Sequence, residues 1–293
     1  MKLKPTMAAL VACLLTAGAW AGPATFSTFA SAGANPTEIT ATRDAFRTAI
    51  GGGTVAGANG SFGGQRFEIN WDGVPNGRAD PNALPGNFFN VNSPRGAVFS
   101  TSGTGFLVSA NAGQATPTLF GFGKDFQTFS PQRLFTAVNS NITDVTFFVP
   151  GTTTAATTNA FGVVFVDVEA AGQTKVEFFD AAGSLIYGQD ALVAGNQGLS
   201  FLGAISNDGG LISRVRLTSG LNTIVANGVL GNPHDDVVVM DDFLYSAPIA
   251  AVPEPSSLAL LSAGLVLIGG MRRRALGVSQ PRSVTGAGGA TAA

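Results

Sequence analysis

One segment near the start of the chain has the apolar spacing of an amphipathic helix, over residues 36–50. Its apolar positions are Ile39, Phe46 and Ile50, and its charged positions Arg43, Asp44 and Arg47 are expected to lie largely away from them. Asn35 is a typical N-cap before a proline, and Glu38 stands where a side chain can reach back to the helix start. Gly51-Gly52-Gly53 is a typical end. The pattern predicts one docking helix, with no chemistry of its own.

From Thr118 to Ser246 the pattern changes to short runs rich in Val, Ile, Phe and Thr, separated by turn sequences such as Asp180-Ala181-Ala182-Gly183. The predicted strands are 120–129, 144–149, 160–168, 174–179, 184–187, 198–205, 212–218 and 237–245. Many short strands at near-regular spacing predict a mainly β fold, an antiparallel, jelly-roll-like β-sandwich over residues 118–246. Residues 22–117 are expected to be an irregular segment docked on it, with short strands at 67–73, 97–100 and 105–109.

The first 21 residues have the pattern of a signal peptide. Lys2 and Lys4 precede an apolar run over residues 7–20, and Ala19-Trp20-Ala21 is a small-x-small cleavage site that would leave Gly22 as the mature N-terminus. An alternative is a lipoprotein box ending at Cys13. If cleavage follows Ala21, the mature chain has no cysteine, because Cys13 is the single one in the sequence.

Near the C-terminus, three unlike elements follow one another. A rigid polar box, Val252-Pro253-Glu254-Pro255, comes before an uncharged run from Leu258 to Met271, and Arg272-Arg273-Arg274 ends that run. The run is short for a membrane span, although flanking serines and arginine stems extend it. The basic cluster predicts that its side stays cytoplasmic.

These three elements resemble the PEP-CTERM sorting signal of Gram-negative bacteria. The resemblance implies export by the Sec machinery, a transient stay in the inner membrane and processing by an exosortase, a membrane transpeptidase-like enzyme. The product would reach the envelope surface or the extracellular matrix, where such proteins are associated with exopolysaccharide. Residues 247–274 are thus expected to be a linker and sorting segment. Residues 275–293, rich in Gly, Ala, Ser and Thr, are expected to be a disordered tail.

Charge argues against nucleic acid as a partner. Between Gly22 and Val252 the chain has 10 Lys or Arg and 17 Asp or Glu, a net charge of −7, and no basic run. The formal charge of −2 for the whole chain hides this acidic body, because the other six basic residues lie in the flanks.

The acidic residues are the strongest candidates for a metal site. Asp167 and Glu169 are spaced to share one face of a strand, and Asp241 and Asp242 follow the apolar run that Asp236 precedes. Jelly-roll modules that the chain resembles often hold structural calcium near a terminal strand. We therefore predict a calcium site from Asp167 or Glu169 with Asp241 or Asp242, the alternative being that these carboxylates are solvated.

Other chemistry is sparse. His234 is the single histidine, so a His-cluster metal site is excluded, and neither a nucleophile elbow nor a phosphate loop is present. Trp71 is a candidate platform for stacking a sugar, or else a core ring. Blocks around residues 68–73, 88–96, 144–151, 161–163 and 175–180 resemble a group of secreted PEP-CTERM proteins of unestablished function. The sequence favours a non-catalytic matrix protein; the alternatives are a carbohydrate-binding module and a polysaccharide hydrolase or lyase with two converging carboxylates.

Overall fold

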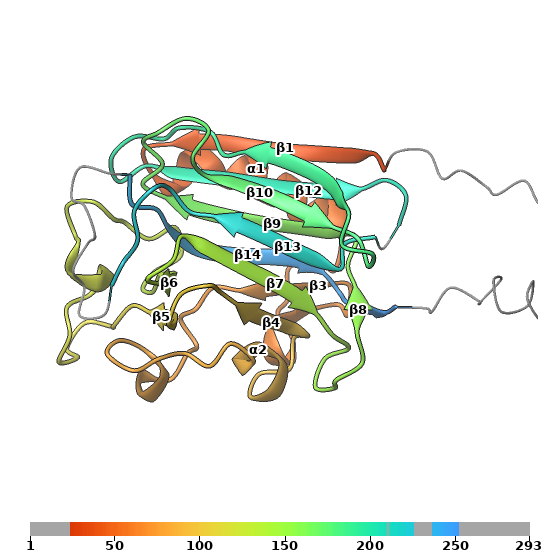
Figure 1. Cartoon of the computed structure of the whole chain (residues 1–293), viewed down its shortest axis with the longest axis horizontal. Coiled ribbons are helices and arrows are strands. Elements are labelled where there is room, and N and C mark those ends of the chain that lie inside the picture. The colour runs from red at the N-terminus through yellow and green to blue at the C-terminus, as the bar shows by residue number, and fades with distance from the viewer. Residues whose placement is uncertain (1–23, 210, 226–235, 252–293) are drawn as a thin grey trace, which may run out of the picture. The chain divides into compact units, whose positions relative to one another are not determined.

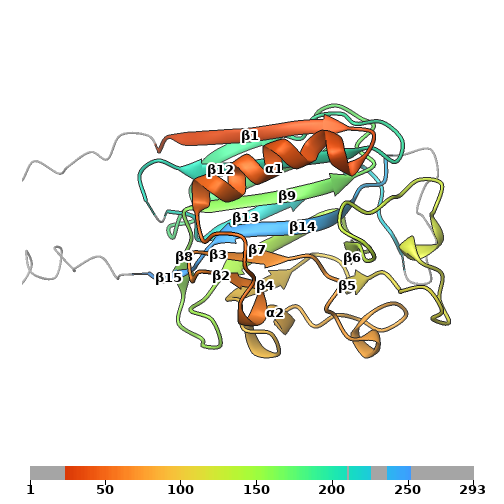
Figure 2. The same cartoon turned by 180° about the vertical axis from the view of Figure 1, so that it is seen from behind.

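The computed structural model describes residues 24–209, 211–225 and 236–251. They belong to one compact unit that ends at Ala251. Two antiparallel sheets lie face to face, and helix α1 (Pro36–Ile50) covers the outer face of the larger one, as Figures 1 and 2 show. The prediction of a mainly β, antiparallel fold is confirmed, with a helical third layer.

The larger sheet has eight strands. Its main order is β1 (Phe26–Gly33), β12 (Leu199–Ser206), β9 (Ala160–Val166), β14 (Val239–Ser246), β3 (Arg66–Ile69) and β2 (Ser61–Phe62). β6 (Phe135–Val138) also pairs with β14, and β5 (Gly105–Val108) pairs with β6. Strand β14 is therefore the junction of this sheet, bordered by β9 on one side and by β3 and β6 on the other.

The smaller sheet has five strands. They are β11 (Leu185–Asp190), β10 (Lys175–Phe179), β13 (Arg214–Thr218), β7 (Ile142–Phe147) and β4 (Ala97–Ser100). A separate pair joins β15 (Ile249–Ala250) to β8 (Ala156–Thr157). The short helices are α2 (Phe88–Val91) and the 3-10 turns at Ala58–Gly60, Asn76–Arg78 and Leu119–Gly121.

The central strands of the larger sheet, β9 and β14, are buried on both faces. Strand β9 has no exposed residue, because Phe161, Val163 and Phe165 face the core between the sheets. Ala160, Val164 and Val166 face a second core on the helix side, which also contains Ile39 and Phe46. In the smaller sheet, β7, β10 and β13 alternate buried and partly exposed residues, as expected for one covered face.

Helix α1 has the predicted bounds. The side chain of Asn35 accepts from the Thr37 backbone N–H at 3.1 Å, and Glu38 accepts from the Ala34 N–H at 2.9 Å. Ile39 and Phe46 are fully buried, as predicted. The expectation that Arg43 and Arg47 point away is wrong for Arg43, whose side chain is 11% exposed and packs against the sheet.

The strand predicted at 120–129 is wrong. That segment starts with the 3-10 turn and continues as turns and loop on the helix side of the larger sheet. Phe120, Phe126 and Phe129 are buried there, so their spacing reflects docking, not strand alternation. Left-handed backbone at Leu119 and Phe120 is incompatible with a strand.

The sheets also contain strands from before residue 118. β1 is an edge strand of the larger sheet, and β4 is an edge strand of the smaller one. β1 and β6 had no predicted counterpart, because their small and mixed residues lack a clear period. The segment 22–117 is therefore built into the sandwich, with β3 and β5 also in the larger sheet.

Phe46 fixes the distance between α1 and the sheet. Its ring lies over Gly162 and Gly203, which are direct partners in the β9–β12 register. A Cβ at Gly162 would stand 2.8 Å from Phe46 Cε1, and one at Gly203 would stand 3.0 Å from Phe46 Cε2. Only a residue without a side chain leaves room for the ring.

We expect Gly162→Ala and Gly203→Ala each to lower the free energy of unfolding by about 1–3 kcal/mol through overpacking. Urea denaturation measures this, with Gly188→Ala in edge strand β11 as the control, since the nearest atom to a Cβ there is 4.0 Å away. In the double variant Phe46→Leu/Gly203→Ala, the smaller leucine side chain should recover part of the stability that Gly203→Ala loses. Additive losses in the double variant would contradict steric contact with this ring.

Candidate functional site

Two consecutive carboxyl groups point to the helix side of strand β14. Met240 pairs with Phe165 and Phe243 pairs with Val163, so two residues of β14 stand opposite one residue of β9. Such a β-bulge breaks the alternation of side chains. Asp241 and Asp242 are the two bulged residues, 0% and 4% exposed.

A chain of hydrogen bonds joins this pair to both elements that cover the sheet. Asp241 Oδ2 accepts from the backbone N–H groups of Phe129, at 2.6 Å, and Ser130, at 3.2 Å. The Ser130 hydroxyl lies 3.1 Å from Asp241 Oδ1 and 2.7 Å from Asp242 Oδ1. Arg43 Nη1 of α1 lies 3.4 Å from Asp242 Oδ2. One carboxyl thus holds the segment around Phe129, and the other holds the helix.

The chain of contacts requires a proton on one carboxyl. A serine hydroxyl has one hydrogen, so it can donate to one carboxylate and must accept from the other group. Burial and the nearby charge of Asp242 raise the pKa of Asp241 well above its ordinary value. Burial also raises the pKa of Asp242, but Ser130 and Arg43 oppose that rise. Asp241 is therefore the protonated member, and the pair carries one negative charge.

This assignment predicts different effects on stability for two isosteric substitutions, Asp241→Asn and Asp242→Asn. Asp241→Asn keeps an acceptor for the two N–H groups and a donor for Ser130, so we expect it to be tolerated, with a melting midpoint within about 3 °C of the parent. Asp242→Asn leaves Arg43 without its buried counter-charge and should lower stability by about 2–4 kcal/mol.

Thermal melts of the two variants at pH 7 measure the difference. Because a carboxyl with a raised pKa in the folded state is destabilising once ionised, the parent should lose stability as pH rises through that pKa. Asp241→Asn should lose less over the same range. Equal losses for the two variants at pH 7 would contradict the protonation assignment.

A second ionic group completes the C-terminal end of α1. Glu68 of β3 accepts from Arg47 of the helix and, at 2.6 Å, from Arg66 Nε. Arg66 also donates to the backbone carbonyls of Arg47, Gly51 and Gly53, so its guanidinium satisfies the open carbonyls of the helix end. Its side chain is 2% exposed.

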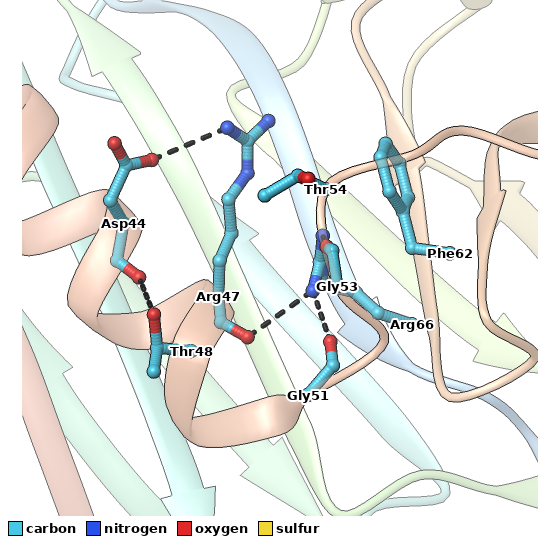
Figure 3. A pocket seen from close by; sticks show the side chains of 8 residues that line it. All are labelled: Asp44, Arg47, Thr48, Gly51, Gly53, Thr54, Phe62 and Arg66. Atoms are coloured by element: carbon cyan, nitrogen blue, oxygen red, sulfur yellow. Dashed lines mark hydrogen bonds and ion pairs between the residues drawn. The ribbon is translucent and has the colours of Figure 1, made fainter.

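Arg47, Arg66 and the glycines Gly51 and Gly53 also line a solvent-facing pocket of about 390 Å³ between the end of α1 and β2–β3. Figure 3 shows Asp44, Arg47 and Thr48 along the helix on one side and Phe62 on the other. Thr54 also lines the pocket. We call this the α1 pocket.

The structure does not gather the four predicted calcium ligands. Asp167 directly follows β9, where Val166 pairs with Val239, and it accepts from the Gln197 N–H at 2.7 Å. Asp241 and Asp242 lie further along β14 with other partners. Within the described ranges, no three or more His, Cys, Asp or Glu side chains are close enough to hold a metal ion. Calcium binding stays a prediction without a formed site.

Asp167 and Glu169, the two acidic residues that follow strand β9, also differ from the expected geometry. Asp167 has φ +74°, so it has left the strand, and it does not share a strand face with Glu169. The Glu169 N–H instead donates to Asp236 Oδ1 at 3.2 Å. The i, i+2 argument failed because β9 ends at Val166.

Trp71 is a core residue, 1% exposed. Its ring stacks on Phe135 with 4.0 Å between centroids, and its Nε1–H donates to the Asp241 carbonyl at 2.9 Å. The prediction of a sugar platform at Trp71 is wrong, because both ring faces are covered by protein. An indole with one satisfied N–H suits this interior position.

The comparisons with known proteins give one result. Residues 251–274 match the PEP-CTERM protein-sorting motif. The chain carries the exosortase sorting signal that its sequence predicted. The PEP-CTERM motif marks it for export and for exosortase processing toward the cell surface or the extracellular space. No curated protein and no solved structure matches the chain.

The residues of the PEP-CTERM motif that sequence analysis singled out, and His234, lie outside the described residues, as does the predicted signal peptide. Strand β15 ends at Ala250, so the described fold reaches the start of the motif. No helix in the described part of the chain is long and apolar enough to span a membrane.

Sequence analysis missed Ser130, which meets the Asp241–Asp242 pair only in the tertiary fold, and it missed Arg66 and Phe62, which line the α1 pocket. One signal was present for Arg43. It stands four residues after Ile39 and three before Phe46, inside the apolar stripe of the helix. A cation in that place indicates a buried counter-charge on the surface that the helix covers.

Asp167 gives a second pH-dependent test. Burial raises its pKa to about 7, against the opposing hydrogen bond from Gln197, and the charges of Glu169, Asp236 and Asp125 add to the rise. Its destabilising effect is absent below about pH 4, grows as pH rises, and is complete above the folded-state pKa. Asparagine keeps the acceptor and tolerates a positive φ.

We therefore expect Asp167→Asn to stabilise the protein by about 2 kcal/mol at pH 8 and by less than half of that near pH 4.5. Urea denaturation at both pH values measures this. The exposed Asp190 serves as control in Asp190→Asn, where no such pH-dependent gain is expected. A gain of equal size at both pH values would show that relief of the buried charge is not the cause.

Proposed function

We propose that this protein is a non-catalytic component of the cell envelope or extracellular matrix that associates with exopolysaccharide after exosortase processing. The observation that carries the proposal is the PEP-CTERM motif, which begins directly after the last strand of a folded sandwich. The sorted product is then essentially the sandwich itself, delivered outside the cell, where polysaccharide is the abundant polymer.

The chemistry of the described fold supports a role in binding. The carboxyl groups of Asp241 and Asp242 are joined through one serine hydroxyl, and both side chains are buried. A glycoside hydrolase needs two carboxyl groups about 5–10 Å apart on either side of an accessible bond. The acidic body with few exposed cations also disfavours phosphate-rich partners.

Replacing Arg272, Arg273 and Arg274 together by Gln should reduce retention at the inner membrane and lower the processed fraction severalfold, because the cytoplasmic basic stop is lost. Pro253→Ala/Glu254→Ala should block processing and leave an unprocessed, membrane-retained chain. Mass spectrometry of both termini and cell fractionation measure the two effects. Wild-type termini and yield in the medium for both variants would contradict exosortase sorting.

Association with polysaccharide is tested with the parent protein in its own host. The processed protein should co-sediment with purified exopolysaccharide and lose that association after enzymatic depolymerisation of the glycan. The Pro253→Ala/Glu254→Ala variant controls for sorting, since it keeps the sandwich unchanged. Equal sedimentation with and without the glycan would reject the association.

A further inference from the structure

We propose that the α1 pocket binds a neutral hexose unit of a polysaccharide. This inference rests on the proposed association with exopolysaccharide and adds the place and the chemical class of the ligand. The argument uses the aromatic wall of the pocket, its polar groups and its charge.

Phe62 supplies a preorganised aromatic wall. The Arg66 guanidinium carbon lies 4.5 Å from the Phe62 ring centroid in a cation–π contact. Arg66 itself is held by Glu68 and by the carbonyls at the end of α1, so the ring packs against a fixed neighbour that also lines the pocket. Phe62 is only partly buried and lines the pocket. A pyranose ring packs its C–H face on such a ring, because the aromatic face is electron-rich.

The opposite side of the pocket presents groups suited to hydroxyl recognition. Asp44 is 51% exposed at its side chain, and its ion pairs with Arg43 and Arg47 both use Oδ1. Its Oδ2 accepts no hydrogen bond from the described residues, so it is open to solvent at the rim of the pocket. Thr48 donates its hydroxyl hydrogen to the Asp44 carbonyl at 2.9 Å, so its oxygen can accept. A carboxylate beside a guanidinium and a hydroxyl can accept from and donate to adjacent sugar hydroxyls.

The charge around the pocket selects a neutral ligand. Three guanidinium groups, on Arg43, Arg47 and Arg66, are balanced by Asp44, by Glu68 and by the single negative charge of the Asp241–Asp242 pair. An added carboxylate or phosphate would meet Asp44 without a free cation to offset it. A neutral pyranose needs no counter-charge.

The size of the pocket fits a single sugar. About 390 Å³ lies at the lower end of the range for small-molecule sites, too small for a long oligosaccharide to be enclosed. The exposed positions of Thr48 and Thr54 leave the neighbouring sugars of a chain in solvent. One unit therefore occupies the pocket, and affinity per protein is weak unless many copies meet one polymer.

The test is isothermal titration of the full chain with hexasaccharides of glucan, mannan and galactan, and with an oligogalacturonate as the acidic probe. A zwitterionic detergent is needed to hold the chain in solution, because alkyl glycosides would compete for the site. We expect at least one neutral hexasaccharide to bind and the oligogalacturonate to bind at least tenfold more weakly.

Three variants probe the pocket while preserving volume as far as the side chains allow. Asp44→Asn and Thr48→Val each remove one polar partner and should weaken binding about fivefold. Phe62→Leu removes the aromatic face and should weaken it about threefold to tenfold. Matched controls are the exposed Thr153 in Thr153→Val and the partly exposed Phe122 in Phe122→Leu, which should bind like the parent. Melting curves check that each variant is folded.

Each outcome decides the inference. Weaker binding in the pocket variants with parent-like controls supports it. If the parent binds a neutral glycan and the pocket variants bind equally well, the site is elsewhere and the proposed association stands. If the acidic probe binds better, the neutral class is wrong. If no probe binds and purified exopolysaccharide does not co-sediment either, both the site and the association fail.

Discussion

The architecture depends on two carboxyl groups that a β-bulge turns to the same side of strand β14. A strand at the junction of a sheet that is buried on both faces would ordinarily carry only apolar residues on its covered side. Here Asp241 and Asp242 lie under the cover, and each is satisfied by a different covering element. Leaving either carboxyl without its partners would lower the free energy of unfolding by several kcal/mol. The positions of α1 and of the segment around Phe129 on the sheet are therefore fixed by these hydrogen bonds as well as by apolar contacts.

Apolar and ionic contacts have different parts in docking helix α1 on the sheet. Phe46 sets the depth of α1 by resting on a pair of glycines, and Arg43 sets its position along the sheet through Asp242. Further along, Arg66 replaces the missing hydrogen bonds at the helix end and at the same time supports Phe62. The α1 pocket is thus a by-product of helix docking whose walls are rigid for structural reasons. Rigid walls lower the entropic cost of binding a ligand there.

The sorting motif and the sandwich have different parts in the function of this protein. The PEP-CTERM motif marks the chain for export and for exosortase processing toward the cell surface or the extracellular space. What the protein does at its destination must come from the surface of the sandwich. The acidic body and the locally neutral pocket are the features of that surface on which the proposal of an uncharged polyol as ligand rests.

The sequence by itself determined the features that rest on local patterns. Caps and periodicity sufficed for the bounds of α1, β-rich periodicity sufficed for the antiparallel class, and three unlike elements in a row sufficed for the sorting motif. Prediction from the sequence failed where one pattern is compatible with two different structures. The phenylalanines of 120–129 have strand-like content but dock as a loop, and Trp71 has the chemistry of a sugar platform but fills the core.

Only the tertiary structure decided the candidate site. Adjacent residues in a strand normally face opposite sides, so nothing in the sequence places Asp241 and Asp242 together; the bulge does, and a bulge is set by pairing with β9. The end of β9 at Val166 likewise separates Asp167 from the expected strand face. The α1 pocket joins a helix end to a hairpin from β2 and β3, and such contacts depend on packing, which local sequence does not encode.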